Sequence, residues 1–408
     1  MQVKIDRLGH LGDGIAHTDE MGVVYVPGGL PGEVAEGAVE RGVMLAPKIV
    51  TPVPERIKAP CSHAKSCGGC QLQHASESFT AQWKEMVVRR ALEAQGLEAE
   101  VLPCITSPSH SRRRASFSAK RTKKGALAGF HQKNSDVIVA VPNCTLVTPA
   151  LVSSLKMVEA LAVLGASRKH ELSVQVTECL TGLDVAVTGG KPVDSAFRSA
   201  LADLAREYDL ARIAWDDEVL ARRPATQRFG EADVVPPPGA FLQATRSGEA
   251  ALLKGVLTAV QGAKRVADLF AGCGTFALPL AQNAEVLAVE GDKAMVQALD
   301  HGWRNAKGLK KVTSHSRDLF RNPLLPDEFA KIDAVVVDPP RAGAEAQIAQ
   351  LAKSRIGQIA HVSCNPVTFA RDCATLVAAG YRLGPVQVVD QFRWSTHVEV
   401  VAGLTFEG

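Results

Sequence analysis

Cys364 stands just beyond an apolar run, Gln358–Val362, that reads as a β-strand. Open α/β sheets bind ligands and carry out chemistry at the carboxyl ends of their strands. A cysteine at such a position can act as a nucleophile if its thiolate is favoured, because the thiolate attacks and the thiol does not. The alternative is a small buried hydrophobic residue, which this run alone would favour.

A second group of cysteines lies earlier in the chain. Cys61, Cys67 and Cys70 follow the pattern Cys-x5-Cys-Gly-Gly-Cys. Three thiolates this close, with glycines that let the backbone fold around a centre, predict a loop that binds a metal or a cluster. A fourth ligand must come from elsewhere, and Cys144 is the best candidate. The spacing leaves zinc and an iron–sulfur cluster equally open.

The segment Asp268–Thr275, with two glycines, follows a predicted strand and opens a helix. Glycines let the backbone approach a bound ligand closely. Glu290 ends the next predicted strand, where an acidic side chain can accept hydrogen bonds from ribose hydroxyls. Asp318 follows the third strand and is placed to line an adenine pocket, and Asp338 ends the fourth. These positions predict a nucleoside-containing ligand.

The elements that must position these residues begin at residue 240. From there, strands and helices alternate with the period of a parallel, doubly wound α/β sheet. Strands are expected at 265–270, 285–290, 312–315, 334–338 and 359–363, and helices are expected to begin at Thr275, Lys293, Ala344 and Val367.

Two further regions precede this sheet. Residues 1–50 read as a small β module whose short strands are broken by glycine-rich turns. Residues 51–239 form a central α+β segment that begins with a Pro-containing linker and includes an amphipathic helix over 75–96. The run Pro236–Gly239 marks the boundary to the last region.

A basic stretch lies in the central segment. Seven of the thirteen residues from Arg112 to Lys124 are lysine or arginine, and the pattern predicts a hairpin whose second strand lies near Leu127–His131. Such a hairpin could neutralise RNA phosphates. The alternative is an edge strand that charge protects from aggregation.

Composition narrows the function classes. An apolar fraction of 46% and a charged fraction of 22% are ordinary for a globular protein, and the net charge of +3 gives no global polycation argument. Nine cysteines in 408 residues are too few for a disulfide scaffold and suit a reducing cytosol. No run predicts a signal peptide or a membrane span, so we expect a cytoplasmic protein without membrane contact.

Several motifs, in order, resemble those of the RNA 5-methyluridine (uracil-C5) methyltransferases. Residues 8–33 resemble a TRAM domain, a small β-barrel found on RNA-modifying enzymes. The cysteine loop, the glycine loop, the run Ser363–Asp372 and the terminal His397–Val401 complete the resemblance. It implies a class I methyltransferase (Rossmann-like) domain at 240–408, a TRAM-like barrel at 1–50 that binds RNA, and an RNA-binding, cluster-binding domain at 51–239.

The resemblance also implies roles for individual residues. Cys364 would add to C6 of the uracil, which makes C5 able to attack a methyl group, and Glu399 would remove the C5 proton. S-adenosylmethionine would be bound by Gln243, Phe270, Thr275, Glu290, Asp318 and Asp338. A [4Fe–4S] cluster would be held by Cys61, Cys67, Cys70 and Cys144.

The branch of the family with both a TRAM domain and a cysteine cluster acts on 23S ribosomal RNA. We therefore expect a structured ribosomal RNA loop as partner, with the uridine flipped out of its stack, and a monomeric enzyme. Alternatives are the same chemistry on a tRNA uridine, and cytosine-C5 RNA methylation, whose enzymes usually carry a second cysteine near Asp338. An iron–sulfur radical enzyme and an RNA-binding module without catalysis are further alternatives.

Overall fold

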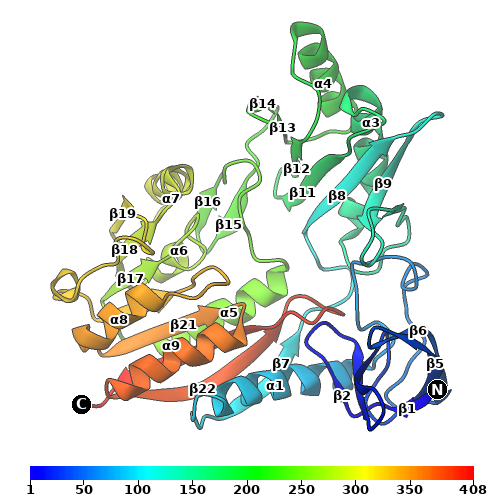
Figure 1. Ribbon diagram of the computed structural model, residues 1–408. Helices are drawn as coiled ribbons and strands as arrows, with labels where there is room; N and C mark the ends of the chain where they lie inside the picture. Colours follow the sequence, from blue (N-terminus) through cyan, green and yellow to red (C-terminus); the bar gives the residue numbers. More distant parts are fainter.

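The computed structural model describes residues 1–408, which form three large β-sheets with helices packed on two of them (Figure 1). The N-terminal sheet lies beside the central cysteine-containing region, and the largest sheet contains the chain's C-terminus. No helix is long and apolar enough to cross a membrane.

The N-terminal sheet has six strands in the order β1-β5-β6-β4-β3-β2. Its strands are β1 (Gln2–Lys4), β2 (Arg7–Leu8), β3 (Gly14–Thr18), β4 (Gly22–Val26), β5 (Val34–Glu40) and β6 (Val43–Thr51). Val24, Val26, Ala35 and Met44 are fully buried between these strands. The small β module expected at the start of the chain is confirmed.

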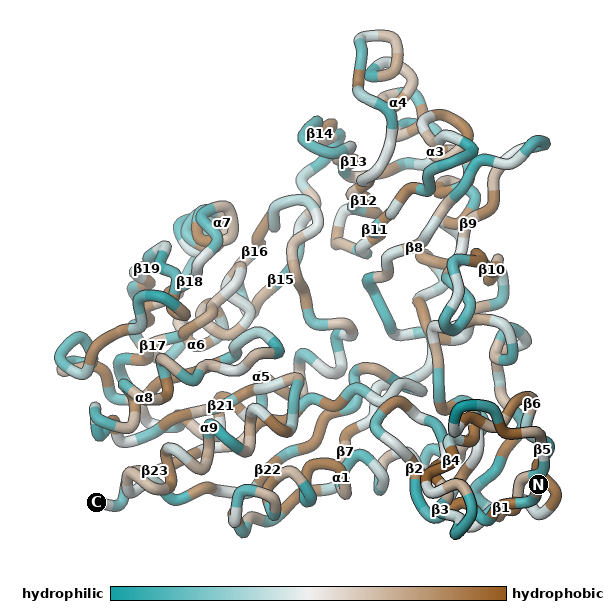
Figure 2. Tube along the Cα trace, in the orientation of Figure 1, coloured by the Kyte–Doolittle hydropathy of each residue, from teal (hydrophilic) through white to brown (hydrophobic).

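The central sheet has seven strands in the order β10-β9-β8-β11-β12-β13-β14. Its elements are β8 (Arg114–Arg121), β9 (Ala126–His131), β10 (Ile138–Val139), α2 (Pro149–Ser153), α3 (Leu155–Gly165), β11 (Leu172–Cys179), β12 (Gly182–Thr188), α4 (Ser195–Glu207), β13 (Arg212–Trp215) and β14 (Glu218–Ala221). The basic stretch forms the hairpin of β8 and β9, as the alternation predicted. Its tip is hydrophilic and projects from the sheet (Figure 2).

The third sheet has eight strands in the order β19-β18-β17-β20-β21-β23-β22-β7. They are β7 (Val101–Thr106), β17 (Arg265–Leu269), β18 (Glu285–Glu290), β19 (Val312–Ser316), β20 (Ala334–Val337), β21 (Gln358–Ser363), β22 (Tyr381–Asp390) and β23 (Glu399–Phe406). Strands β17 to β21 are parallel, as expected. Strand β23 is antiparallel to β21, and β22 is antiparallel to β23.

Helices cover both faces of this sheet, which is why its central strands are almost wholly apolar. The associated helices are α1 (Glu77–Glu93), α5 (Arg246–Ala259), α6 (Ala277–Leu280), α7 (Lys293–Asn305), α8 (Glu345–Ser354), α9 (Pro366–Ala378) and the 3₁₀ turn η1 (Pro326–Phe329). Helices α1, α8 and α9 bury residues of one face, including Leu269 and Val337. Helices α5 and α7 bury residues of the other face, including Val266 and Val336.

Two features of this sheet were not expected. Strand β7 pairs with β22, and α1 packs on α9, although both precede residue 240. The helix expected from Thr275 is only the short α6, because the chain first turns through the glycine loop. The hairpin of β15 (Gln227–Phe229) and β16 (Ala232–Val234), which precedes the parallel strands in the chain, packs against α7.

Candidate active site

Cys364 lies at the carboxyl end of β21, immediately before α9, and its side chain is partly exposed. Asn365 caps α9, since its side-chain oxygen accepts a hydrogen bond from Val367 N. Pro366 occupies the first helical position, where its missing N–H costs no hydrogen bond. The sequence therefore turns sharply from strand to helix and leaves the thiol at the edge of the sheet.

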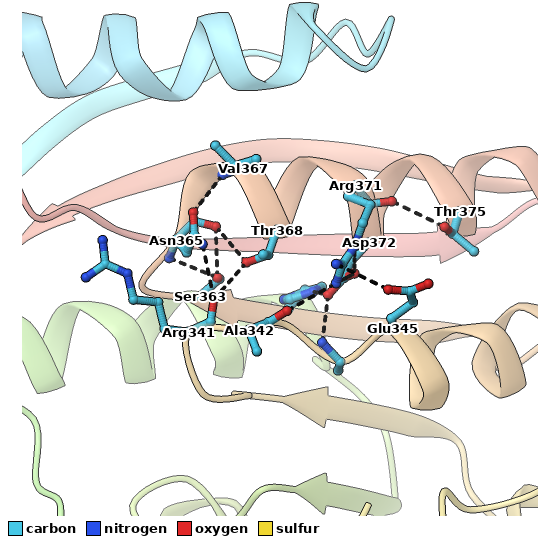
Figure 3. A network of polar contacts seen from close by, with 12 residues as sticks. Arg341, Ala342, Glu345, Ser363, Asn365, Val367, Thr368, Arg371, Asp372 and Thr375 are labelled. Atoms are coloured by element: carbon cyan, nitrogen blue, oxygen red, sulfur yellow. Dashed lines mark hydrogen bonds and ion pairs between the residues drawn. The ribbon is translucent and has the colours of Figure 1, made fainter. Parts of the chain in front are cut away.

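A polar network fixes this turn (Figure 3). Ser363 Oγ accepts from Asn365 N at 3.1 Å, and Asn365 Nδ2 donates to Arg341 O at 3.1 Å. Asp372 of α9 is buried and accepts from Ala344 N at 3.0 Å. These bonds join the loop after β20 to the loop after β21, so the two loops that carry Asp338 and Cys364 are held as one unit.

Glu399 begins β23, the strand beside β21, and its side chain is buried. Burial, with a smaller contribution from the charge of Asp338, raises the pKa of Glu399 to about 8, although a hydrogen bond from Gln391 acts in the opposite direction. Asp338 follows β20, and burial raises its pKa to about 7. Both carboxyl groups can therefore change protonation near neutral pH.

The Cys364 thiol lies within the electrostatic reach of both carboxyl groups. Burial, together with the charges of Glu399 and Asp338, raises the pKa of Cys364 to about 11, although the charge of Arg341 acts in the opposite direction. The structure thus brings Asp338, Cys364 and Glu399 together, although Asp338 and Glu399 are 61 positions apart in the sequence. A thiol and a carboxyl group of raised pKa are the group types that covalent addition and proton removal require.

Gln391 joins this group, although no sequence motif indicated it. It is buried in the loop between β22 and β23, and its Nε2 donates to Gln243 Oε1 at 2.6 Å. Gln243 Nε2 in turn donates to Asp338 Oδ2 at 3.5 Å. The one feature of the sequence that could have indicated Gln391 is the polar pair Asp390-Gln391 at the end of an apolar run.

The glycine loop lies at the carboxyl end of β17. Phe270 and Gly272 both have left-handed φ angles, 62° and 54°, which is unusual for phenylalanine and marks a strained turn. Glu290 ends β18, where its Oε2 accepts from Gly272 N at 2.9 Å and its Oε1 accepts from Asp292 N at 2.9 Å. Thr275 lies in the same loop and is partly exposed.

Asp268, inside β17, is fully buried. Burial raises its pKa well above the usual range, the charge of Asp338 acts in the same direction, and a hydrogen bond from the backbone of Ala277 acts in the opposite direction. Burial of a charged carboxylate is costly, which favours the protonated form of this group.

A cleft of about 710 Å³ opens between β18, β19 and η1, and the glycine loop and Glu290 do not line it. Asp318 lines it together with apolar Leu287 and Val289. Phe270 and Phe320 lie near this side of the sheet with ring centroids 5.3 Å apart. The structure thus places Glu290, Asp318 and Phe270 along one edge of the sheet, with acidic groups and apolar walls suited to a nucleoside.

The four cysteines of the predicted cluster site line a single cavity of about 270 Å³. Cys61 Sγ accepts from His63 N, and Cys67 Sγ accepts from Gly69 N, both at 3.4 Å. Burial, with smaller contributions from the charges of Cys144, Cys67 and Cys61, raises the pKa of Cys70 to about 12. No group of three or more His, Cys, Asp or Glu side chains converges as ligands of one metal ion.

The cysteine loop also holds the segment that leads to Glu399. Gln71 N and Leu72 N both donate to Trp394 O, at 2.8 and 2.9 Å. Trp394 is buried with a φ of 62°, so its backbone conformation depends on these contacts. Gly12 of the N-terminal sheet packs on Gln71 and Thr396. All three regions of the chain therefore meet at this segment.

Fold and site together define a class I methyltransferase that carries a TRAM domain. A family model described as tRNA (Uracil-5-)-methyltransferase matches residues 236–406, and one described as TRAM domain matches residues 1–41. A protein of Rhizobium meliloti named as an uncharacterized RNA methyltransferase is 47% identical over 98% of both chains.

The 23S rRNA (uracil(1939)-C(5))-methyltransferase RlmD of Shewanella piezotolerans is 31% identical over 98% of this chain and 95% of its own. The tRNA (uracil-54, C5)-methyltransferase of Pyrococcus abyssi, solved with S-adenosyl-L-homocysteine, has the same fold, with a TM-score of 0.75, 24% identity and 99% of both chains covered. This chain belongs to the RNA (uracil-C5) methyltransferase family. It is an enzyme that transfers the methyl group of S-adenosylmethionine to C5 of uracil in RNA.

Proposed function

We propose that this enzyme methylates a uridine of 23S ribosomal RNA through a covalent bond between Cys364 Sγ and C6 of the base. The observation that supports this mechanism is that Cys364, Asp338 and the buried Glu399 lie close together at one edge of the sheet. Uracil C5 is a poor nucleophile until a thiolate adds at C6, so a cysteine is needed beside the base.

The chemistry follows from the positions of these groups. After the Cys364 thiol has given up its proton, Sγ bonds to C6 and C5 becomes enolate-like. C5 then attacks the methyl carbon of S-adenosylmethionine, which leaves as S-adenosylhomocysteine. Glu399 removes the C5 proton, and the Sγ–C6 bond breaks. A pKa of about 8 suits Glu399 to this role, because a base works best when its pKa lies near the working pH.

The methyl donor would occupy the cleft beside β18 and β19. Glu290 would accept hydrogen bonds from the ribose hydroxyls, Asp318 would line the adenine pocket, and Phe270 and Thr275 would lie along the glycine loop. Gln243 and Asp338 are joined by a hydrogen bond, so in this proposal both would lie where the methyl donor meets the target base and would contact the reacting groups.

The cavity of the four cysteines fits a [4Fe–4S] cluster, since Cys61, Cys67, Cys70 and Cys144 all face one space and two of the sulfurs already accept backbone N–H bonds. When bound, the cluster would supply a rigid, multiply charged centre. The chain's own part is to hold Gln71 and Leu72 against Trp394, and thereby to order the segment before Glu399.

The ribosomal substrate is supported by the name of the Shewanella relative, and the TRAM domain supports RNA contact outside the catalytic region. The hairpin of β8 and β9 carries the exposed cations Lys120, Arg121, Lys123 and Lys124. We place the TRAM-like barrel at 1–50, the RNA- and cluster-binding region at 51–239 and the methyltransferase region at 240–408. We expect a monomer that works in the cytoplasm on a flipped uridine of an RNA loop.

The test is methylation of unmodified 23S rRNA and tRNA by the purified protein with S-adenosylmethionine, followed by digestion and mass spectrometry of the nucleosides. 5-Methyluridine in 23S rRNA alone supports the proposal. The same product only in tRNA keeps the mechanism and overturns the substrate, as the family model's description would allow. 5-Methylcytidine overturns the base assignment.

A further inference from the structure

A backbone N–H group fixes which end of the Gln391 side-chain amide is the oxygen and which is the nitrogen. Its Oε1 accepts a hydrogen bond from Ala244 N at 2.8 Å. A backbone N–H can only donate, so the amide end that faces Ala244 must be the oxygen. The Nε2 end of Gln391 is therefore left for Gln243 Oε1, 2.6 Å away, and for Glu399.

The same reasoning carries through Gln243. Because its Oε1 accepts from Gln391, its Nε2 faces the other way, toward Asp338 Oδ2 at 3.5 Å. Each group in this chain therefore donates to the next: Ala244 N to Gln391, Gln391 to Gln243, and Gln243 to Asp338. Without Gln391, the amide of Gln243 could turn over and present its oxygen instead.

The surroundings keep Gln391 in this pose. Both Gln391 and Gln243 are buried, with 1% and 3% of their surface exposed. A side chain at Gly248 would come within 2.6 Å of Gln391 Cβ, so the glycine of α5 makes room for it. Arg113 Nε donates to Gln243 O at 3.2 Å and fixes the backbone of Gln243 from the other side.

We propose that Gln391 is a positioning residue that holds Gln243 as a hydrogen-bond donor toward the target base, and thereby selects uracil over cytosine. Uracil carries a carbonyl oxygen, an acceptor, at C4, where cytosine carries an amino group, a donor. A fixed Gln243 N–H pairs with the carbonyl and leaves the amino group facing another donor. A site built around a fixed donor rejects a ligand that lacks the matching acceptor.

This inference rests on the proposed uracil-C5 reaction and is tested with RNA hairpins that carry uridine, 4-thiouridine or cytidine at the target position. Sulfur at C4 is a weak acceptor, so the wild-type enzyme should lose about tenfold in kcat/KM with 4-thiouridine. The Gln391→Leu variant should lose about tenfold with uridine, because Gln243 is no longer fixed. Its further loss with 4-thiouridine should shrink to roughly twofold, and its preference for uridine over cytidine should fall.

The matched control is Gln387→Leu on β22. Gln387 makes side-chain hydrogen bonds to Pro103 O and Val388 O, away from the site, so its variant should keep the wild-type ratios. If Gln391→Leu lowers kcat/KM equally for all three RNAs, its role is structural and the inference is wrong. Unchanged ratios with unchanged rates also contradict it. Failure of the wild-type enzyme to methylate uridine would instead refute the proposed function.

Discussion

Lys84 of α1 and Asp390 at the end of β22 form an ion pair with 2.6 Å between Nζ and Oδ1, and both side chains are buried. Lys84 Nζ also donates to Phe392 O at 3.4 Å. The pair lies beside Gln391, which contacts Gln243 and Glu399. A helix from the first quarter of the chain therefore fixes the loop that carries the proposed base, across 306 positions of sequence (390 − 84).

Breaking this pair from one side should be severe. Lys84→Met leaves Asp390 buried and uncompensated, which costs about 3–5 kcal/mol of unfolding free energy. The double variant Lys84→Met with Asp390→Leu should regain part of this loss, since no charge is then stranded. Urea unfolding measures both variants, and the control is Lys254→Met at an exposed position of α5, which is expected within about 0.5 kcal/mol of wild type. A single-variant cost no larger than the control's would refute the structural role of this pair.

The raised pKa of Glu399 predicts a stability that falls with pH. From its usual value near 4.5 up to about 8, the native state holds a proton that the unfolded state has lost. Stability from this group is complete below the unfolded pKa and is lost as pH rises through the native pKa. Glu399→Gln should remove this loss. The free energy of unfolding of the variant, relative to that of the wild type, should therefore be larger at pH 9 than at pH 6.

Chemical unfolding at the two pH values measures that gain. Asp338 titrates in the same window, so only the difference between wild type and variant isolates Glu399. Glu98→Gln, at an exposed position, is the control and should show no such gain. A Glu399→Gln variant that tracks the wild type at both values would mean that Glu399 is not held protonated.

The cysteine cavity predicts a bound cluster. Cys70→Ala should abolish iron and sulfide binding in protein purified without air, together with the visible absorption of an iron–sulfur centre, and should lower the thermal midpoint. Cys104→Ser should keep the bound iron and sulfide, the visible absorption and the thermal midpoint of the wild type, because Cys104 does not line the cavity. Zinc in place of iron in the wild-type protein would contradict the assignment.

The hairpin of β8 and β9 predicts salt-dependent RNA binding. Lys123 and Lys124 are exposed at its tip. Replacing both by Gln should weaken RNA binding and reduce the slope of log K against log salt by about 0.7–0.9 for each phosphate that the hairpin no longer neutralises. The rate constant at saturating RNA should not change. Lys307→Gln, an exposed lysine after α7, is the control, and an equal effect there would show that the hairpin is only solvated surface.

Much of this architecture could be predicted from local pattern. The parallel strands from β17 to β21 were visible because buried strands with capped helices between them leave a clear period. The N-terminal module and the basic hairpin were visible through turn glycines and alternation. Strand β7 was not assigned to the large sheet, because its pairing with β22 is a contact between residues almost 300 positions apart and has no local signature.

The site divides in the same way. The positions of Cys364 and Glu290 in the fold could be predicted, because each lies at the carboxyl end of a recognisable strand. Gln391 could not, since a buried glutamine looks like any polar residue at a strand end until its partners Ala244 and Gln243 are known. The link from the cysteine loop to Trp394 is likewise made by backbone groups, which leave no trace in side-chain identity.

The covalent role of Cys364 is tested most directly by trapping the adduct. In Glu399→Gln the C5 proton cannot be removed, so the Sγ–C6 bond cannot break by elimination after methyl transfer. Incubated with S-adenosylmethionine and an RNA hairpin, this variant should form a complex that survives denaturation and has the mass of protein plus methylated RNA. The complex should be absent when Cys364→Ala is added to the same variant. Release of free 5-methyluridine RNA by Glu399→Gln at the wild-type rate, or an adduct that persists without Cys364, would contradict the mechanism.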